Sequence, residues 1–459
     1  MRLKGLKGRN IHIVGLSSVE GAAITEFLYK NGCEDITAHD FCDEKDFIKN
    51  FARFNVNLTA VQRKEKLKIL KNKNIKKHFG NSYLKSIEKA DLIFVGQAWY
   101  KYKFNFPKLK KARDGGVPLM TIINLYLDLF PGTTIGITGS NGKTTVTSLT
   151  YHILKSINKN RTFVAGNIDS EVQVLNQVMK SSAKDLLVLE ISNRQLKLLG
   201  GSKSNIALIT NITENHLDEH DGIEEYAKNK FKIASANKII LNNKDPLTKK
   251  FLSKNLKPIW FNDEKILKKF GLVKSDLKLP GKHNLENLYA ALHIIKALKS
   301  NEKINHANGK MKMAVQTFKS VEKRLEIIGE KNGVKIVNDL SSTTPTSTIF
   351  ALEAFPNSTF SIVLGCEHKG GSYEKLIKKL ADLQKQKVLK KILLLPGGIA
   401  KIIKESNLQT IDVKSFEKIA AKFNTNAHHE IGDYLIISPS GEKVISVHLK
   451  NKTLKKIFG

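Results

Sequence analysis

The chain has 459 residues, of which 41% are hydrophobic, so it is long and apolar enough to form about three domains with buried cores. Its formal net charge is +33, but the lysines are spread along the whole chain without interleaved aromatic residues, which favours a solvated surface and no nucleic-acid partner. No run approaches the ~18 apolar residues of a membrane span, and the three cysteines are too few for a disulfide framework and suit the reducing cytoplasm.

The first strand is predicted at Ile11–Gly15. The basic start before it is similar to that of a signal peptide, but the apolar patch is short, lacks a small-residue cleavage site and runs into a glycine turn. A helix is expected at Glu20–Asn31, and a second strand at Ile36–Asp40 ends on an acidic residue. Strand, turn, helix, strand and acid form the outline of a nucleotide-binding fold, although the turn reads GLSSVEG and not GxGxxG.

The rest of the chain continues this alternation of apolar strands and amphipathic helices, which predicts parallel sheets in an α/β protein. Residues 44–90 are charged and helical in character. Further strands are predicted at Leu92–Val95, Thr133–Thr138, Asp185–Ile191, Ile206–Thr210, Val334–Val337, Phe360–Leu364, Ile392–Leu395 and Tyr434–Ile437.

The sequence GITGSNGKTT at Gly136–Thr145 is the sharpest motif of the chain. A strand ends at Thr138 and a helix begins near Lys143, so the two glycines between them let backbone N–H groups turn toward phosphate oxygens. Lys143 supplies a positive charge, the hydroxyl of Thr144 can bind Mg²⁺, and the helix N-terminus adds its dipole. The strict Walker form has glycine where Ile137 stands, so this is a variant phosphate loop.

Domain boundaries are expected near residues 126–131 and near residues 300–310, where the sequence SNEKINHANGK is polar. They give a first domain of residues 1–126, a central domain of residues 127–300 and a last domain of residues 301–459. We expect the first and last domains to be Rossmann-like and the central domain to have a parallel sheet of the P-loop ATPase type.

Downstream of the phosphate loop, acidic residues and histidines follow two strands. Glu190 lies at the C-terminal end of a predicted buried strand, where ligands of open α/β sheets bind, so it is a candidate Mg²⁺ ligand or a cap of the next turn. By composition the nearby lysines Lys228, Lys230 and Lys232 belong to a surface helix. The loop between the strand Ile206–Thr210 and this helix holds four residues that are either metal ligands or ordinary solvated loop residues, namely His216, Asp218, His220 and Asp221.

The order of these motifs, followed by GKHNLENLYAAL at Gly281–Leu292, resembles that of the Mur ligases over about residues 127–375. Within this family the sequence motifs are most similar to those of the members that add D-glutamate to UDP-N-acetylmuramoyl-L-alanine. That similarity is seen in GNI (Gly166–Ile168), LEISNRQL (Leu189–Leu196), HLD, EKRLE (Glu322–Glu326) and NDLSSTTPTST (Asn338–Thr348).

The resemblance implies roles for individual residues. The ATP-binding residues would be Gly139, Ser140, Asn141, Gly142, Lys143, Thr144, Thr145, Asn284, Asn287, Arg324 and Asp339. Two Mg²⁺ ions would be held by Thr144, Glu190, His216 and Lys230, with Lys230 as a carbamate; Lys143, Glu190, His216 and Lys230 would be the catalytic residues. The muramoyl substrate would meet Leu16, Ser17, Asp40, Asn167 and Ser192, and the incoming amino acid would meet Thr343 and Lys369.

The implied chemistry is ATP-dependent amide-bond formation in peptidoglycan precursor synthesis, by a cytoplasmic monomer. A substrate carboxylate attacks the γ-phosphate of ATP, and the amino group of D-glutamate then displaces phosphate from the acyl phosphate. Mg²⁺ and Lys143 would neutralise charge. Positioning and electrostatics would dominate, because no nucleophilic side chain is needed.

Three departures from the family pattern stand out. Ser341 occupies a position where the family often has lysine, and GQAWYKYKFNFP after the strand Leu92–Val95 replaces a Ser-Pro-Gly turn. The C-terminal segment reads SPSGEKVISVHLK from Ser438 and lacks a Ser- and Phe-containing stretch of the family. These departures keep open a related ligase with another amino-acid specificity, such as a folylpolyglutamate-synthase-like enzyme, and a nucleotide-binding partner subunit without activity.

Overall fold

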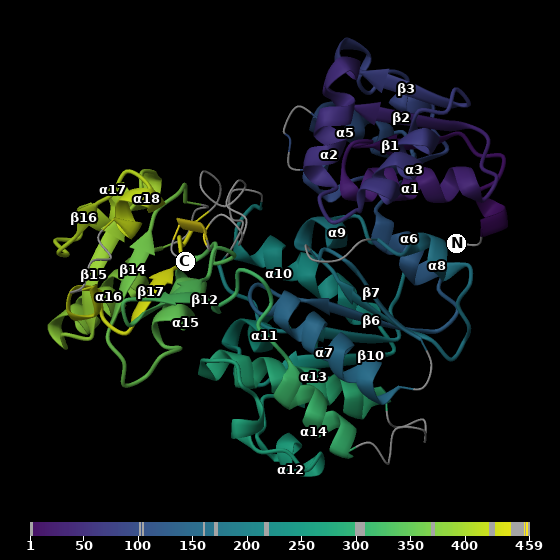
Figure 1. Ribbon diagram of the computed structural model, residues 1–459. Coiled ribbons are helices and arrows are strands. Elements are labelled where there is room, and N and C mark those ends of the chain that lie inside the picture. Colours follow the sequence, from purple (N-terminus) through teal and green to yellow (C-terminus); the bar gives the residue numbers. More distant parts are fainter. Residues whose placement is uncertain are drawn as a thin grey trace.

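The computed structural model describes residues 3–100, 102, 105–158, 161–168, 173–214, 220–298, 308–368, 372–421, 427–441, 454 and 456–457. Its strands form three separate sheets, each with helices packed on it (Figure 1). We name the units built on these sheets the first, second and third domains, in chain order.

The first domain has a five-stranded parallel sheet in the order β3-β2-β1-β4-β5. The order reverses between β1 and β4, so a crevice for ligands is expected outside the carboxyl ends of these two strands. Its strands are β1 (Ile11–Val14), β2 (Ile36–Asp40), β3 (Ile75–Phe79), β4 (Leu92–Val95) and β5 (Leu119–Met120). Its helices are α1 (Val19–Lys30), α2 (Phe47–Phe54), α3 (Ala60–Leu70), α4 (Gln97–Tyr100), α5 (Phe106–Asp114) and α6 (Ile122–Leu129).

The second domain has a six-stranded parallel sheet in the order β11-β10-β9-β6-β8-β7. Its strands are β6 (Thr133–Thr138), β7 (Thr162–Gly166), β8 (Leu186–Glu190), β9 (Ile206–Ile209), β10 (Lys238–Asn242) and β11 (Ile259–Phe261). Its helices are α7 (Lys143–Ile157), α8 (Leu175–Val178), α9 (Asn193–Lys197), α10 (Ile223–Phe231), α11 (Pro246–Phe251), α12 (Lys265–Lys269), α13 (Lys282–Leu298) and α14 (Asn308–Thr317).

The third domain has a six-stranded mixed sheet in the order β12-β13-β17-β14-β15-β16, in which only the edge strand β12 runs antiparallel to its neighbour. Its strands are β12 (Glu326–Lys331), β13 (Val334–Asn338), β14 (Phe360–Leu364), β15 (Leu389–Leu394), β16 (Ile411–Asp412) and β17 (Tyr434–Ile437). Its helices are α15 (Pro345–Leu352), α16 (Glu374–Lys385), α17 (Gly398–Lys404), α18 (Phe416–Ala420) and α19 (Ala427–Ile431).

The first domain rests on the second through helices. In Figure 1 the first domain lies above the second domain, with α6, α8 and α9 between their sheets. Buried side chains of α6, such as Ile123 and Tyr126, share one continuous hydrophobic core with Leu187 of β8 and Ile209 of β9. This shared apolar core fixes how the first domain sits on the second.

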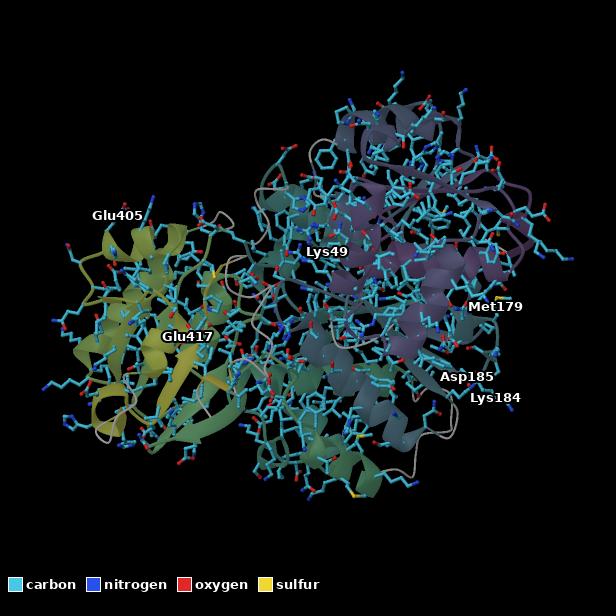
Figure 2. All side chains as sticks on the ribbon, turned by 45° about the horizontal axis from the view of Figure 1, so that its top comes forward. Lys49, Met179, Lys184, Asp185, Glu405 and Glu417 are labelled. Atoms are coloured by element: carbon cyan, nitrogen blue, oxygen red, sulfur yellow. The ribbon has the colours of Figure 1, made fainter. Side chains whose placement is uncertain are left out.

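Charged side chains cover all three domains in Figure 2, where Lys49 belongs to the first domain, Lys184 to the second, and Glu405 and Glu417 to the third. This distribution agrees with the solvated surface expected from composition. Among the described residues, the helices are too short or too polar for any of them to cross a bilayer.

The predicted α/β fold class with parallel sheets is confirmed, and the strand β12 adds an antiparallel edge that the sequence did not suggest. Strand β3 lies within the segment that was expected to be helical throughout. The division of the chain near residues 126 and 300 stays a prediction. Helix α14, which begins after the second of these positions, packs on α7, and its Met311 and Val315 belong to the core of the second domain.

Candidate active site

The phosphate loop joins β6 to α7 at the carboxyl edge of the second sheet, and both glycines have backbone conformations that disfavour other residues. Gly139 has φ +148° and Gly142, the N-cap of α7, has φ +81°. A Cβ at position 139 would overlap the hydroxyl of Thr210, and one at position 142 would lie 2.5 Å from Oδ1 of Asn287. The loop is therefore pressed against β9 and α13, and its backbone can approach a phosphate only with glycine at both places.

Three side chains line the start of α7 with charge and hydroxyl groups. The Nζ atom of Lys143 donates to the carbonyl oxygens of Gly139 and Ser140, each at 3.0 Å. The hydroxyl of Thr144 accepts a hydrogen bond of 2.8 Å from Nη2 of Arg324, which belongs to the third domain. The loop thus gathers two cations at a helix N-terminus, which is an arrangement suited to an anion.

The second and third domains enclose an open cleft around this loop, with a cavity volume of about 160 Å³. Most of the residues that the sequence predicted for ATP line it: Ser140, Asn141, Gly142, Lys143, Thr144, Thr145, Asn284, Asn287, Arg324 and Asp339. Thr343, predicted for the amino acid, lines the same cleft. Gly139 belongs to the loop but does not line the cleft.

The N-terminal turn of α13 forms one wall of the cleft and opens into a smaller adjoining pocket. Asn287 donates to Oδ1 of Asn284 at 3.1 Å, and Asn284 donates to the carbonyl of Pro280 at 2.7 Å. The ring of His283 stacks on that of Phe350 with centroids 5.3 Å apart, and both rings line the cleft and the adjoining pocket. A planar group can rest on these rings, and the sequence pattern did not single out either residue.

Asp339 presents a buried carboxylate from the third domain. Its Oδ2 accepts from the Ser438 hydroxyl at 2.8 Å, and its Oδ1 accepts from the Leu325 N–H at 3.2 Å. Burial raises the pKa of Asp339 to about 7, although these hydrogen bonds and the nearby Arg324 act to lower it. The carboxyl can therefore change its protonation state near neutral pH.

Glu190 ends β8 in register with Ile137 of β6, so it lies at the same sheet edge as the phosphate loop. Its side chain is 2% exposed, and its Oε1 accepts a hydrogen bond of 3.2 Å from Nδ2 of Asn167. Asn167 directly follows β7, and its N–H donates to the Glu190 carbonyl at 2.8 Å. The pair brings the predicted muramoyl contact beside the predicted metal ligand.

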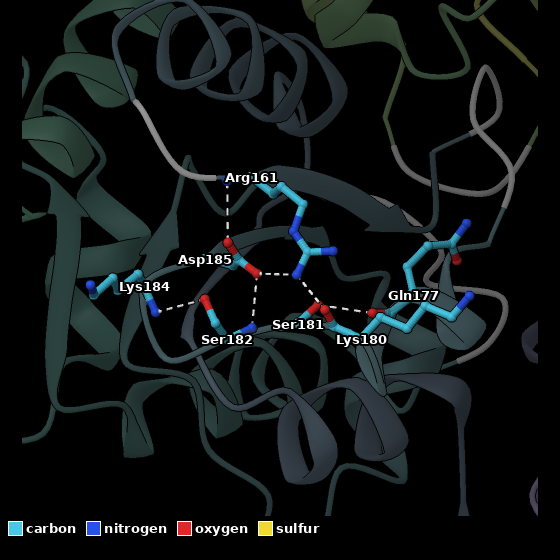
Figure 3. Close-up of polar contacts among 7 residues, drawn as sticks. All are labelled: Arg161, Gln177, Lys180, Ser181, Ser182, Lys184 and Asp185. Atoms are coloured by element: carbon cyan, nitrogen blue, oxygen red, sulfur yellow. Dashed lines mark hydrogen bonds and ion pairs between the residues drawn. The ribbon is translucent and has the colours of Figure 1, made fainter.

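The opposite ends of β7 and β8 are tied together by one ion pair, shown in Figure 3. Asp185 accepts from Nη2 of Arg161 and from the Ser182 N–H, each at 2.8 Å, and Arg161 also donates to the Lys180 carbonyl. Burial alone would raise the pKa of Asp185, but these donors hold it below its usual value. Because the strands are parallel, this contact helps to fix the register that places Asn167 beside Glu190.

Lys230 lies on α10 but is not a surface residue, in contrast to what its lysine-rich surroundings suggest. It is 1% exposed, its Nζ donates to the Gly139 carbonyl at 2.9 Å, and Nζ lies 4.4 Å from the centroid of the Tyr226 ring. Burial, and after it the charge of Lys143, lowers the pKa of Lys230 well below its usual value. Burial therefore favours the unprotonated amine over the ammonium at this position.

The chemistry of the donors at this edge suits Mg²⁺, which prefers oxygen ligands. Thr144 offers a hydroxyl and Glu190 a carboxylate, and a carbamate on Lys230 would add two oxygens. Among the residues that the structure describes, no group of three His, Cys, Asp or Glu side chains could hold a metal ion. The predicted ligand His216 lies outside the described residues, as does Lys369.

The residues predicted to contact the muramoyl substrate fall in two places. Leu16, Ser17 and Asp40 lie at the carboxyl edge of the first sheet, where Oδ2 of Asp40 accepts from both the N–H and the hydroxyl of Ser17 at 2.7 Å. Ser192 lies in the second domain as the N-cap of α9, with a capping box to Gln195. The structure does not bring the first group into the nucleotide cleft.

Sequence reasoning missed several polar residues near the site, among them Glu20 and Gln195, which are buried, and Gln97, which is half-buried. Glu20 belongs to the segment GLSSVEG, which was noted for its departure from GxGxxG, and Gln97 to the segment that departs from the family pattern. Burial raises the pKa of Glu20 to about 7 against the effect of its hydrogen bonds. No feature of the local sequence marks these residues, because their hydrogen-bond partners lie far away in the chain.

Comparison with known proteins agrees with this geometry. The family model for the Mur ligase middle domain matches residues 137–295, which include the phosphate loop, Glu190, Lys230 and the start of α13. A UDP-N-acetylmuramoylalanine–D-glutamate ligase of Solibacter usitatus is 31% identical in an alignment that covers 77% of this chain and 82% of that protein. A ligase of the same name from Acetivibrio thermocellus is 28% identical over 95% of this chain and 92% of its own length.

The fold is also shared with solved structures. A MurF ligase from Thermotoga maritima, in complex with ADP, superposes with a TM-score of 0.56 at 18% identity, and the match covers 99% of this chain and 95% of that one. Members of the family are ATP-dependent amide-bond ligases with three domains. On the identity and coverage of its relatives, the chain belongs to the Mur ligase family.

Proposed function

We propose that this protein joins D-glutamate to UDP-N-acetylmuramoyl-L-alanine, with hydrolysis of ATP to ADP and phosphate, in the synthesis of peptidoglycan precursors. The observation that carries the proposal is the cleft in which the phosphate loop faces Arg324 and Asp339 across the boundary between two domains. The relatives that are similar over most of the chain have names that state this reaction.

ATP would lie in this cleft with its phosphates against the backbone of residues 139–145 and the ammonium of Lys143. The N-terminal dipole of α7 and the guanidinium of Arg324 would favour the same negative charge. Asn284 and Asn287 would face the nucleotide from α13, and Asp339 would contact it from the third domain. Because contacts come from both domains, nucleotide binding would draw the third domain toward the second.

Mg²⁺ supplies charge neutralisation at the phosphates when it is bound. Two such ions would be held by Thr144, Glu190, His216 and carbamylated Lys230. The neutral amine of Lys230 attacks carbon dioxide, a C–N bond forms and a proton leaves, so a buried amine becomes an anion that can ligate a cation. Burial that lowers the pKa of Lys230 supports this step, because only the unprotonated amine reacts.

The proposed reaction has two steps that need no nucleophilic side chain. The carboxylate of the L-alanyl group attacks the γ-phosphorus, the bond to the β–γ bridging oxygen breaks, and ADP leaves. The amine of D-glutamate then attacks the acyl carbon, the C–O bond to phosphate breaks, and inorganic phosphate leaves. The nitrogen loses a proton as the amide forms. Lys143 and the loop N–H groups stabilise the charge that moves onto phosphate oxygens.

The two substrates would approach from opposite sides. The nucleotide-linked sugar would extend from the first domain, with Leu16, Ser17 and Asp40, toward Asn167 and Ser192 in the second. D-glutamate would enter from the third domain beside Thr343 and Lys369, where the lysine would meet a carboxylate. We further propose that the enzyme acts in the cytoplasm as a monomer.

The experiment that tests the proposal is ADP release by the purified protein with ATP, Mg²⁺ and UDP-N-acetylmuramoyl-L-alanine, with one amino acid added at a time. D-glutamate is expected to stimulate ADP release well above L-glutamate, D-aspartate and glycine. Equal stimulation by another amino acid would make this a Mur ligase of different specificity, and no stimulation by any of them would contradict the proposal.

A further inference from the structure

One carboxylate, that of Glu20, joins three separate elements near the boundary between the first and second domains. Glu20 is the second residue of α1 and is 5% exposed. Its Oε2 accepts from the backbone N–H of Gln97 at 2.7 Å, and its Oε1 accepts from Nε2 of Gln195 at 2.5 Å. Gln97 begins α4 in the first domain and Gln195 lies on α9 in the second, so the carboxylate bridges the two domains.

From Gln97 a second set of hydrogen bonds leads to the candidate metal ligand. Nε2 of Gln97 donates to Oδ1 of Asn167 at 2.5 Å, and Nδ2 of Asn167 donates to Oε1 of Glu190 at 3.2 Å. A carboxylate accepts but does not donate, so the NH₂ group of Asn167 must face Glu190. The direction of every bond from Glu190 back to Gln97 follows from this.

The other branch has a fixed direction as well. Oε1 of Gln195 accepts from the Ser192 N–H at 2.8 Å, so the NH₂ group of Gln195 must point at Glu20. Glu20 therefore meets two donors at once, a backbone N–H and a side-chain NH₂. An amide at position 20 could satisfy only one of them, although it has the same shape.

We propose that Glu20 is a positioning residue that seats the first domain on the second and holds Asn167, Glu190 and Ser192 in the orientation that the ligation step requires. This inference rests on the proposed function, because it takes Asn167 and Ser192 as substrate contacts and Glu190 as a metal ligand. Glu20 does not line the nucleotide cleft. Its loss therefore changes turnover and leaves ATP binding intact.

The test uses the full-length protein and exchanges the two side chains. In Glu20→Gln the NH₂ group of the introduced amide would face one of the two donors that Glu20 accepts from, the Gln97 N–H or the NH₂ group of Gln195. The kcat of ligation is therefore expected to fall at least tenfold, while the KM for ATP stays within about twofold. In the double variant Glu20→Gln with Gln195→Glu, the amide introduced at position 20 accepts from the Gln97 N–H and donates to the carboxylate introduced at position 195. The second oxygen of that carboxylate accepts from the Ser192 N–H. All the hydrogen bonds are restored, so kcat is expected to return to within about threefold of wild type.

A second readout does not depend on activity. Hydrogen–deuterium exchange of the backbone amides of α9 is expected to speed up in Glu20→Gln and to return to the wild-type rate in the double variant. The proposal is wrong if Glu20→Gln keeps wild-type kcat, if the double variant is no better than the single one, or if the KM for ATP rises in parallel with the loss of kcat. If the wild type itself makes no product with the proposed substrates, the proposed function fails, and the exchange rates still decide whether Glu20 couples the domains.

Discussion

The guanidinium of Arg324 donates a hydrogen bond to the hydroxyl of Thr144 over 2.8 Å, although the two residues are 180 positions apart in the chain. Thr144 belongs to the phosphate loop of the second domain, and Arg324 precedes β12 of the third. This contact places a cation of the third domain where phosphate groups would be bound. It joins the phosphate loop directly to the third domain.

Replacement of Arg324 by alanine is expected to weaken ATP binding by about 1.5–3 kcal/mol, the range for a charge-assisted hydrogen bond. The KM for ATP would rise roughly tenfold or more, since the third domain would lose its cation at the phosphates. Steady-state kinetics with varied ATP measure this. Arg113→Ala, at an exposed position on α5, is the control and should leave the KM unchanged; an equal effect in both variants would show that Arg324 has no specific role.

Replacement of Lys143 by alanine is expected to lower kcat/KM for ATP at least a hundredfold, which corresponds to about 2.7 kcal/mol. The reason is the loss of the ammonium group beside the loop carbonyls at the N-terminus of α7. Lys155→Ala removes an exposed lysine from the last turn of the same helix and should behave as wild type. If Lys143→Ala retained more than a tenth of the activity, the assignment of the phosphate loop would be wrong.

Lys230→Ala is expected to be nearly inactive and to recover part of its activity when a short-chain carboxylic acid is added. The acid would replace the carbamate as an anionic oxygen ligand in the space left beside Gly139 and Tyr226. Lys228→Ala, an exposed lysine on the same helix, should be fully active and insensitive to the acid. Full activity of Lys230→Ala without any additive would rule out the carbamate.

Asp339 should make the protein less stable as pH rises toward neutrality. Its carboxyl has a pKa of about 7 in the folded protein and an ordinary value of 3.8. Between these values the folded state holds a proton that the unfolded state has lost, so stability falls as pH rises through this window by up to about 1.4 kcal/mol per pH unit and is level above it. Asp339→Asn should show a shallower fall in Tm from about pH 5 to pH 7; a slope equal to that of wild type would contradict the raised pKa.

Strands at the centre of the parallel sheets could be predicted from the sequence almost residue by residue. Leu92–Val95 and Phe360–Leu364 agree with β4 and β14 because strands buried on both faces are largely apolar runs. Thr133–Thr138 (TTIGIT) agrees with β6 as the strand that leads into the phosphate loop. Edge strands could not be predicted in this way. In β3 (IKKHF) two lysines interrupt the apolar pattern, and only pairing with β2 gives the segment its strand conformation.

The same distinction between local sequence and contacts distant in the chain applies to the candidate site. The phosphate loop could be found because its glycines and Lys143 are contiguous, and their function depends on local backbone geometry. The burial of Lys230 could not be read from the residues around it, because Lys228 and Lys232 on either side are exposed. The contact between Glu20 and Gln195 joins residues 175 positions apart, and no local pattern encodes it.

The mass of the product is the measurement that tests the proposed reaction most directly. The purified protein is incubated with ATP, Mg²⁺, UDP-N-acetylmuramoyl-L-alanine and D-glutamate, and the nucleotide sugar is analysed by mass spectrometry while ADP is quantified in the same sample. We predict that the nucleotide sugar gains one glutamyl residue for each ADP formed, and that Lys143→Ala forms neither product. An unchanged mass of the nucleotide sugar in the presence of folded enzyme, or ADP release without a coupled gain in mass, would contradict the proposed function.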